Sequence, residues 1–170
     1  NTLKMIVGEK TFNEAMKTYY SRWKFKHPSA KDFVDVVNEV VAKNHPQEFG
    51  EGMDWFFQQV LYGTEICDYA VTSISNNNKI TSSGIFDNLE ECEQSEDAKN
   101  ENGVMIISSN VVVQRVGDMT LPMEILIQFD DGKEVIEKWD GMSTMKIFSY
   151  EGTQKIVCAE IDPEDKIFLD

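Results

Sequence analysis

Residues 123–139 read MEILIQFDDGKEVIEKW, and this stretch has the clearest secondary-structure pattern in the chain. Its first half alternates apolar and polar residues, the pattern of a strand with one buried face; the apolar positions are Met123, Ile125, Ile127 and Phe129. Asp131-Gly132 then supplies a tight turn that needs positive φ, and the chain returns through Val135 to Trp139. We therefore predict an antiparallel β-hairpin.

Further short segments with strand-like composition flank this hairpin: residues 69–74, 79–86, 104–116, 146–150, 154–161 and 166–169. Seven or so short strands predict a C-terminal meander that forms an antiparallel β-sandwich domain over residues 67–170. Residues 87–103 carry seven acidic residues and one Lys, which predicts a flexible acidic loop. Because this loop lacks the ligand spacing of an EF-hand, we predict no calcium site in it.

Residues 1–66 have the periodicity of helices instead, so the fold class is α+β. Gly8 is expected to end one short helix, and a capping box of Thr11 and Glu14 to begin the next. After Pro28, Ser29 and Asp32 predict a second N-terminus, followed by a valine-rich buried face. A third helix, Met53 to Tyr62, is apolar almost all round and must be covered on several sides.

Composition and net charge exclude several classes of binding partner. A chain of 170 residues with 41% hydrophobic residues and a net charge of −14 is globular and strongly acidic, so nucleic acid and anionic membranes are not expected as partners. No apolar run is long enough to span a bilayer, and no secretory signal is visible. The chain opens in mid-pattern at Asn1, as a piece of a longer protein would.

Catalytic residues are scarce. The two histidines, His27 and His45, flank one helix, and no H-E-x-x-H is present. Three isolated cysteines allow at most one disulfide; Cys67 and Cys158 are expected to be buried, as small apolar residues are. Asp130, Asp131, Glu134 and Asp140 are candidates for an acid–base pair only because acidic residues are abundant in this chain, and Asp131 is already explained by the hairpin turn. We predict no catalytic, cofactor-binding or metal-binding residue in this chain.

The large aromatic side chains leave two interpretations open: Trp23, Trp55, Phe56, Phe57, Tyr62 and Trp139. Each fits the core face of its predicted element, and some of them could instead form an exposed patch that docks another domain.

Two runs of residues carry a resemblance to a known family. Tyr20-x-x-Trp23-x-Phe25-x-His27-Pro28-x-x-x-Asp32-Phe33 and Asp54-Trp55-Phe56-Phe57-Gln58-Gln59-Val60-Leu61-Tyr62-Gly63 resemble the zinc aminopeptidases of the gluzincin class, the membrane alanyl aminopeptidase family. The Asp130-Asp131-Gly132 turn, Trp139-Asp140-Gly141 and Ala159-Glu160-Ile161-Asp162-Pro163 are similar to the β-domain of bacterial members. The resemblance covers nearly the whole chain except the acidic loop.

The resemblance implies that residues 1–66 close a thermolysin-like catalytic domain, and that the zinc-binding motif and its catalytic residues lie upstream of Asn1. The implied partners are that catalytic domain and, for the parent protein, a peptide substrate, while zinc belongs to the upstream domain. The alternative is a stand-alone β-sandwich module that binds a partner without enzymatic activity. An independent enzyme is the weakest hypothesis, because the residues for one are missing.

Overall fold

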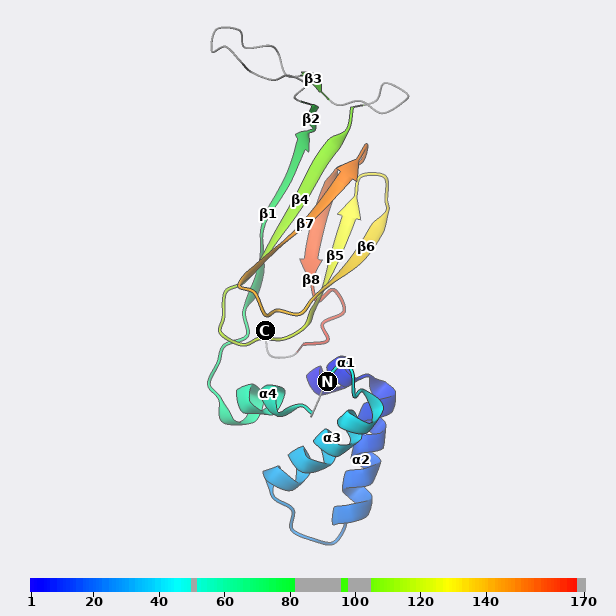
Figure 1. The fold of residues 1–170 in the computed structure, drawn as a ribbon, viewed down its shortest axis with the longest axis vertical. Coiled ribbons are helices and arrows are strands. Elements are labelled where there is room, and N and C mark those ends of the chain that lie inside the picture. The colour runs from blue at the N-terminus through cyan, green and yellow to red at the C-terminus, as the bar shows by residue number, and fades with distance from the viewer. Residues whose placement is uncertain (50–51, 82–95, 98–104, 168–170) are drawn as a thin grey trace. The chain divides into compact units, whose positions relative to one another are not determined.

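The computed structural model describes residues 1–49, 52–81, 96–97 and 105–167, and it has helices in its N-terminal part followed by antiparallel sheets (Figure 1). The chain divides into two compact units. The first contains Asn1–Asp68, Gly117–Pro122 and Glu164–Asp170; the second contains Tyr69–Val116 and Met123–Pro163. The observed class is therefore α+β, as the sequence predicts.

In the first unit, helices α1 (Thr2–Val7) and α2 (Glu9–Trp23) are separated by Gly8, whose φ of 79° confirms the predicted glycine stop. The capping box predicted at Thr11 is wrong. Because α2 begins at Glu9, Thr11 lies inside the first turn, where its side chain is buried and contacts His45 instead.

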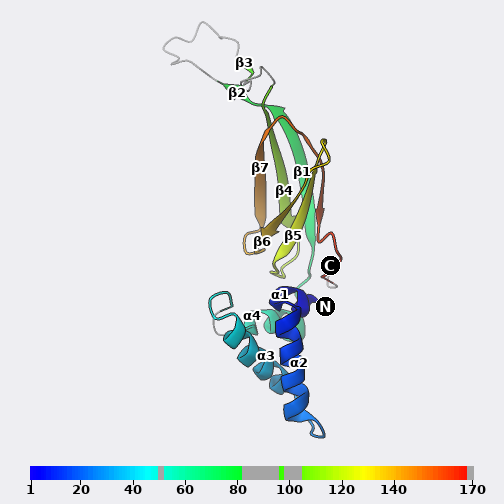
Figure 2. The ribbon, with the colours of Figure 1, turned by 90° about the vertical axis from the view of Figure 1, so that its right-hand side faces the viewer.

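Helix α3 (Ala30–Asn44) begins where the sequence predicts. Ser29 and Asp32 form a reciprocal capping box: the Ser29 backbone N–H donates to Asp32 Oδ2 over 2.7 Å, and the Asp32 N–H donates to Ser29 Oγ over 3.4 Å. The Ser29 hydroxyl and N–H also hold the pKa of Asp32 below its ordinary value. The predicted valine face is buried, and α3 packs along α2 (Figure 2).

The third predicted helix is α4 (Asp54–Phe57), which continues as a π-helical turn, η1 (Gln58–Tyr62). Asn38 of α3 positions its start, because Asn38 Oδ1 accepts from the Met53 N–H over 2.7 Å and Asn38 Nδ2 donates to Asp54 Oδ1 over 2.6 Å. Phe57 is buried and packs edge-on against Phe33, with ring centroids 5.9 Å apart.

Residues 117–122 join this helical unit through backbone hydrogen bonds. The Gly117 N–H donates to the Asp68 carbonyl over 3.0 Å, and the Met119 N–H donates to Ile66 over 3.1 Å. Gln59 of η1 also bonds Thr120, since its Oε1 accepts from the Thr120 N–H over 2.7 Å and its Nε2 donates to the Thr120 carbonyl over 3.3 Å. The π-helical turn is thus held by a segment distant in sequence.

The second unit consists of antiparallel strands. Strands β1 (Tyr69–Asn78), β4 (Ile107–Arg115) and β7 (Met145–Gly152) form one sheet in the order β1-β4-β7. Strands β6 (Glu134–Trp139), β5 (Met123–Phe129) and β8 (Ile156–Ile161) form another in the order β6-β5-β8. The short strands β2 (Ile80–Thr81) and β3 (Glu96–Asp97) pair with each other.

The central hairpin is confirmed: β5 pairs with β6, and Gly132 has a φ of 85°. The predicted meander is wrong, because β7 pairs with β4 rather than with its sequence neighbour β6. Lys166 and Ile167 are not in a strand, contrary to the prediction for 166–169. Within the predicted strand 79–86, residues 82–86 lie outside the described residues, as does the acidic loop 87–103 apart from β3.

The core of this unit follows the alternation of the strands. On β5, Met123, Ile125 and Ile127 are at most 2% exposed, and on β4 Val111 and Val113 are fully buried. Aromatic rings connect strands of different sheets. Tyr69 of β1 meets Trp139 of β6 edge-on, and Phe129 of β5 meets Tyr150 of β7 in the same way. The pKa of Tyr150 is raised above its ordinary value by burial and by its hydrogen bond to Glu137.

Asn76 of β1 connects the two sheets by hydrogen bonds. Its Nδ2 donates to the Ile156 carbonyl of β8 over 3.0 Å, and its Oδ1 accepts from the Ile156 N–H over 2.9 Å. Oδ1 also accepts from the hydroxyl of Ser109, which is 1% exposed, over 2.7 Å. The Asn76 side-chain amide therefore makes the two hydrogen bonds to the Ile156 backbone that a neighbouring strand would otherwise make.

We expect Asn76→Ala to lower the free energy of unfolding by about 2–3 kcal/mol, because the buried Ser109 hydroxyl and the Ile156 backbone lose their partner. Urea unfolding followed by far-UV circular dichroism measures this loss. Asn77→Ala, the same change one residue along the strand, is the control, and we expect it to change stability by less than about 0.5 kcal/mol. Equal losses in both variants would contradict the role of the Asn76 amide.

Candidate functional site

His45 is the centre of the one arrangement in the described residues that resembles a catalytic relay. Its Nε2 lies 2.9 Å from Thr11 Oγ1, and its Nδ1 lies 3.2 Å from Glu48 Oε2. A carboxylate has no proton to give, so the tautomer that places donor and acceptor in relay order carries its proton on Nδ1, and its Nε2 accepts from the Thr11 hydroxyl. This is the order of acid, base and nucleophile in a hydrolase triad.

The burial of Thr11 argues against catalysis. Thr11 is 5% exposed, so a substrate atom has no approach to its hydroxyl at the distance of about 3 Å that attack requires. The chain of hydrogen bonds instead ties the first turn of α2 to the C-terminal end of α3, where His45 is the C-cap. His27, the other histidine, lies exposed in the α2–α3 turn, so the two histidines do not form one site.

The acidic residues near the hairpin all accept hydrogen bonds, and Asp131 supports the turn as the sequence predicts. Asp131 Oδ1 accepts from the Lys133 N–H over 2.9 Å, and Asp140 Oδ1 accepts from the Met142 N–H over 3.1 Å. Asp130 Oδ1 accepts from the Lys155 N–H over 3.1 Å, and Glu134 accepts from Gln128 over 2.9 Å. All four are exposed, and each already accepts a hydrogen bond within the β unit, so the arrangement offers no acid–base pair.

The two described cysteines differ in their surroundings. Cys67 is buried, as predicted, whereas Cys158 is exposed. The prediction for Cys158 is wrong because the pairing of β8 with β5 sets Cys158 opposite Gln128, on the face of the sheet away from the buried β5 residues. Cys92 lies outside the described residues.

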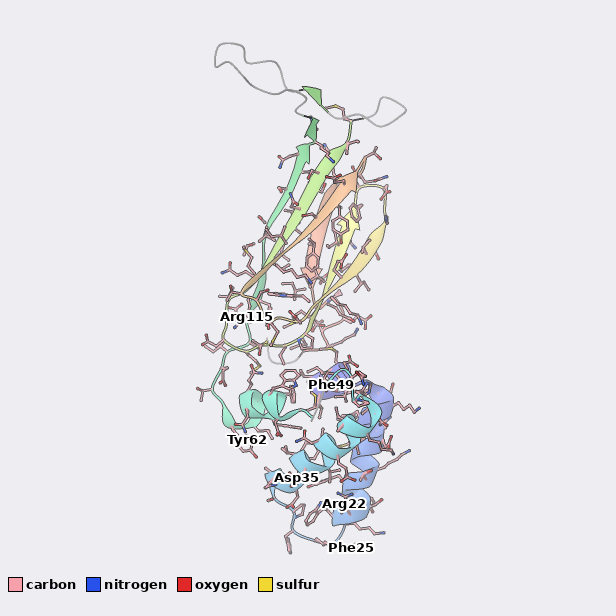
Figure 3. All side chains as sticks on the ribbon, in the orientation of Figure 1. Arg22, Phe25, Asp35, Phe49, Tyr62 and Arg115 are labelled. Carbon is pink, nitrogen blue, oxygen red and sulfur yellow. The ribbon has the colours of Figure 1, made fainter. Side chains whose placement is uncertain are left out.

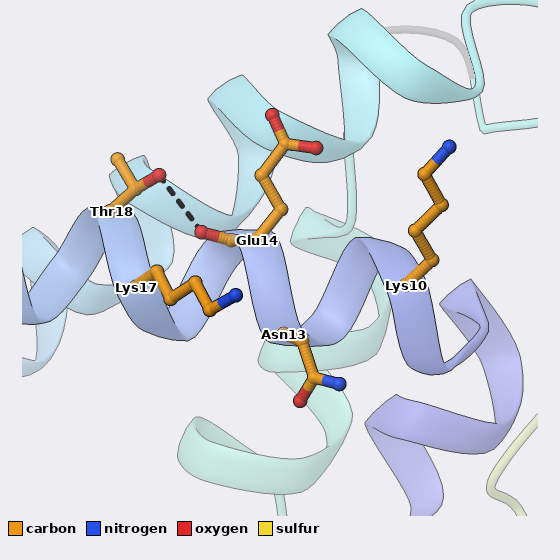
Figure 4. Close-up of a pocket in the computed structure, with 5 residues that line it drawn as sticks. All are labelled: Lys10, Asn13, Glu14, Lys17 and Thr18. Carbon is orange, nitrogen blue, oxygen red and sulfur yellow. Dashed lines mark hydrogen bonds between the residues drawn. The ribbon is translucent and has the colours of Figure 1, made fainter.

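The helical unit has a shallow depression along the outer face of α2, with a volume of about 410 Å³ (Figure 4). Polar residues line it: Lys10, Asn13, Glu14, Lys17 and Thr18. Thr18 Oγ1 donates to the Glu14 carbonyl over 2.8 Å, while the Glu14 carboxylate bonds Asn44 and Lys43, which hold its pKa below the ordinary value. Glu14 and Thr18 thus already have partners, and the other lining residues are two lysines and an asparagine, so the depression has no evident catalytic chemistry.

Exposed apolar side chains are the more informative feature of the helical unit. Along α4, η1 and the residues that follow, the exposed fractions are 38% for Trp55, 49% for Leu61, 56% for Tyr62 and 67% for Ile66. We call these four residues the exposed apolar set. Phe25, in the turn between α2 and α3, is 98% exposed (Figure 3). Among the aromatic residues with two open interpretations, Phe56, Phe57 and Trp139 belong to the core, whereas Trp55 and Tyr62 are exposed.

Phe25 is the feature that sequence reasoning missed. It appears in the sequence only as one aromatic residue among several at the end of a helix, within the run that carries the family resemblance. The only available signal was its position between Lys24 and Lys26, which is an unusual setting for a buried ring.

Two searches of the described residues found no candidates: no helix is long and apolar enough to cross a membrane, and no group of three or more His, Cys, Asp or Glu side chains is placed to hold a metal ion. No protein-family model matches the chain, and a search of curated proteins gave no match.

Proposed function

We propose that this chain is the non-catalytic C-terminal part of a zinc metallopeptidase of the aminopeptidase type. In this proposal the helical unit closes the thermolysin-like catalytic domain, and the two three-stranded sheets form a β-sandwich that supports it. The zinc ligands and the catalytic residues belong to the preceding part of the polypeptide.

The exposed apolar set is the observation that carries this proposal. Helix α4 and η1 are apolar on two sides: Phe56 and Phe57 are at most 4% exposed, while Trp55, Leu61 and Tyr62 remain between 38% and 56% exposed. Several large apolar side chains exposed along one short segment are typical of interaction surfaces in soluble proteins. A neighbouring catalytic domain would cover these side chains.

The placement of the resembling residues adds support. Tyr20 to Phe33 spans the end of α2, the following turn and the start of α3, and Asp54 to Gly63 coincides with α4 and η1. The sandwich is supported by the rings that join strands of different sheets, Tyr69 with Trp139 and Phe129 with Tyr150.

The test is to express the polypeptide of the natural reading frame that contains residues 1–170, and to compare it with the isolated 170-residue chain. For the longer polypeptide we expect about one bound zinc per chain by mass spectrometry of the metal, and hydrolysis of aminoacyl p-nitroanilides that a zinc chelator abolishes. The isolated chain serves as the negative control, because it contains no H-E-x-x-H. A natural polypeptide that binds no zinc and cleaves no peptide bond would exclude the peptidase.

A further inference from the structure

We propose that the turn between α2 and α3 is a docking anchor, in which Phe25 inserts into an apolar pocket with an acidic rim on the part of the natural polypeptide that precedes residue 1. This inference rests on the proposed function, and it names the chemistry of the surface that the helical unit meets there.

The conformation of the turn presents the Phe25 ring to its surroundings. Phe25 has a φ of 64°, in the left-handed region that bulky side chains rarely adopt, and it is 98% exposed. Two backbone hydrogen bonds hold this conformation: Lys24 N–H to the Tyr20 carbonyl over 2.9 Å, and Lys26 N–H to the Trp23 carbonyl over 3.0 Å. A strained backbone that carries a fully exposed aromatic ring is the kind of outlier that indicates function.

The helices on both sides keep the turn rigid. Arg22 donates two hydrogen bonds to the Glu39 carboxylate, over 2.8 and 3.1 Å, which fastens the last turn of α2 to α3. On the other side, the capping box of Ser29 and Asp32 sets the start of α3. Because the turn is ordered in advance, docking would lose little conformational entropy.

The charge around Phe25 specifies an acidic partner surface. Residues 17–31 contain five Lys and Arg and no acidic residue, although the whole chain has a net charge of −14. Arg22 and Lys31 are paired with Glu39 and Asp35. Lys24 and Lys26, the two lysines beside Phe25, are exposed. Lys26 Nζ lies 5.5 Å from the centre of the Trp23 ring. Carboxylates at the rim of a pocket would complement these two charges.

The size of the anchor favours a partner in the same polypeptide. One aromatic side chain buries roughly 200 Å², whereas stable complexes between separate proteins bury at least about 1,200 Å². A covalently linked partner has an effective concentration near millimolar, so a small anchor suffices. An anionic membrane is disfavoured, because the negative net charge opposes approach to an extended anionic surface.

Hydroxyl-radical footprinting with mass spectrometry tests this proposal. We expect the oxidation rate of Phe25 in the natural polypeptide to fall at least about tenfold relative to the isolated chain, as burial of a fully exposed ring would cause. An added peptide corrects for radical dose, and Met142, 71% exposed in the other unit, is compared in the same spectra. An unchanged Phe25 rate overturns the proposal, and so does protection that requires added vesicles containing phosphatidylserine.

Charge reversal tests the acidic rim. We expect the double variant Lys24→Glu, Lys26→Glu to return the Phe25 oxidation rate in the natural polypeptide toward that of the isolated chain. Lys10→Glu with Lys17→Glu, the same charge change along α2, is the matched control and should keep Phe25 protected. If Phe25 stays protected in both variants, the acidic rim is wrong. Footprinting requires neither bound zinc nor peptidase activity. The docking proposal and the peptidase proposal are therefore tested independently.

Discussion

Gly117→Ala should lower the free energy of unfolding of the helical unit by about 3–5 kcal/mol, because a Cβ at this position would collide with main chain. It would lie 2.0 Å from the Ile66 carbonyl oxygen and 2.9 Å from the Asp68 nitrogen. Neither atom moves without breaking the backbone hydrogen bonds that join residues 66–68 to 117–119. Urea unfolding followed by circular dichroism gives the stability, and hydrogen exchange of the α3 amides shows whether the loss belongs to this unit.

Gly132→Ala is the control for this prediction. Gly132 has a φ of 85°, but a Cβ there would meet nothing within 4 Å, so only backbone strain of about 1 kcal/mol is expected. The comparison separates a collision from an unfavourable φ. If Gly117→Ala were no more destabilising than Gly132→Ala, the close approach of residues 66 and 117 would be incorrect.

Trp139→Ala should destabilise the β unit by about 3–5 kcal/mol, the usual cost of removing a large buried aromatic side chain. Trp139 is 2% exposed, its ring packs edge-on against Tyr69, and its Nε1 donates to Ser143 Oγ over 3.3 Å. Calorimetry or far-UV circular dichroism is the suitable measurement, because the substitution itself changes the tryptophan fluorescence.

Trp139→Phe is the matched variant for Trp139→Ala. It keeps a ring against Tyr69 and loses the indole N–H and part of the volume, so a loss of about 1–2 kcal/mol is expected. A Trp139→Ala loss below about 1 kcal/mol would mean that this side chain is not part of the core.

The candidate site shows where sequence reasoning stops. The scarcity of catalytic residues is visible in the composition, and the turn role of Asp131 follows from its neighbour Gly132. Thr11 and His45 are 34 residues apart, and only the packing of α2 on α3 brings them to 2.9 Å. The outward orientation of the Phe25 ring depends on a left-handed backbone conformation after the end of α2. An aromatic residue in the sequence does not predict that conformation.

Features that depend only on neighbouring residues could be predicted from the sequence. The Asp131-Gly132 hairpin, the Gly8 stop and the Ser29 cap each need only a local φ or a side chain that reaches its own backbone. The tertiary structure alone decided that β7 pairs with β4, that Cys158 faces outward and that Asn76 bonds β8. Alternation shows that a strand has two faces, but its partner is chosen by the long-range packing that buries one of them.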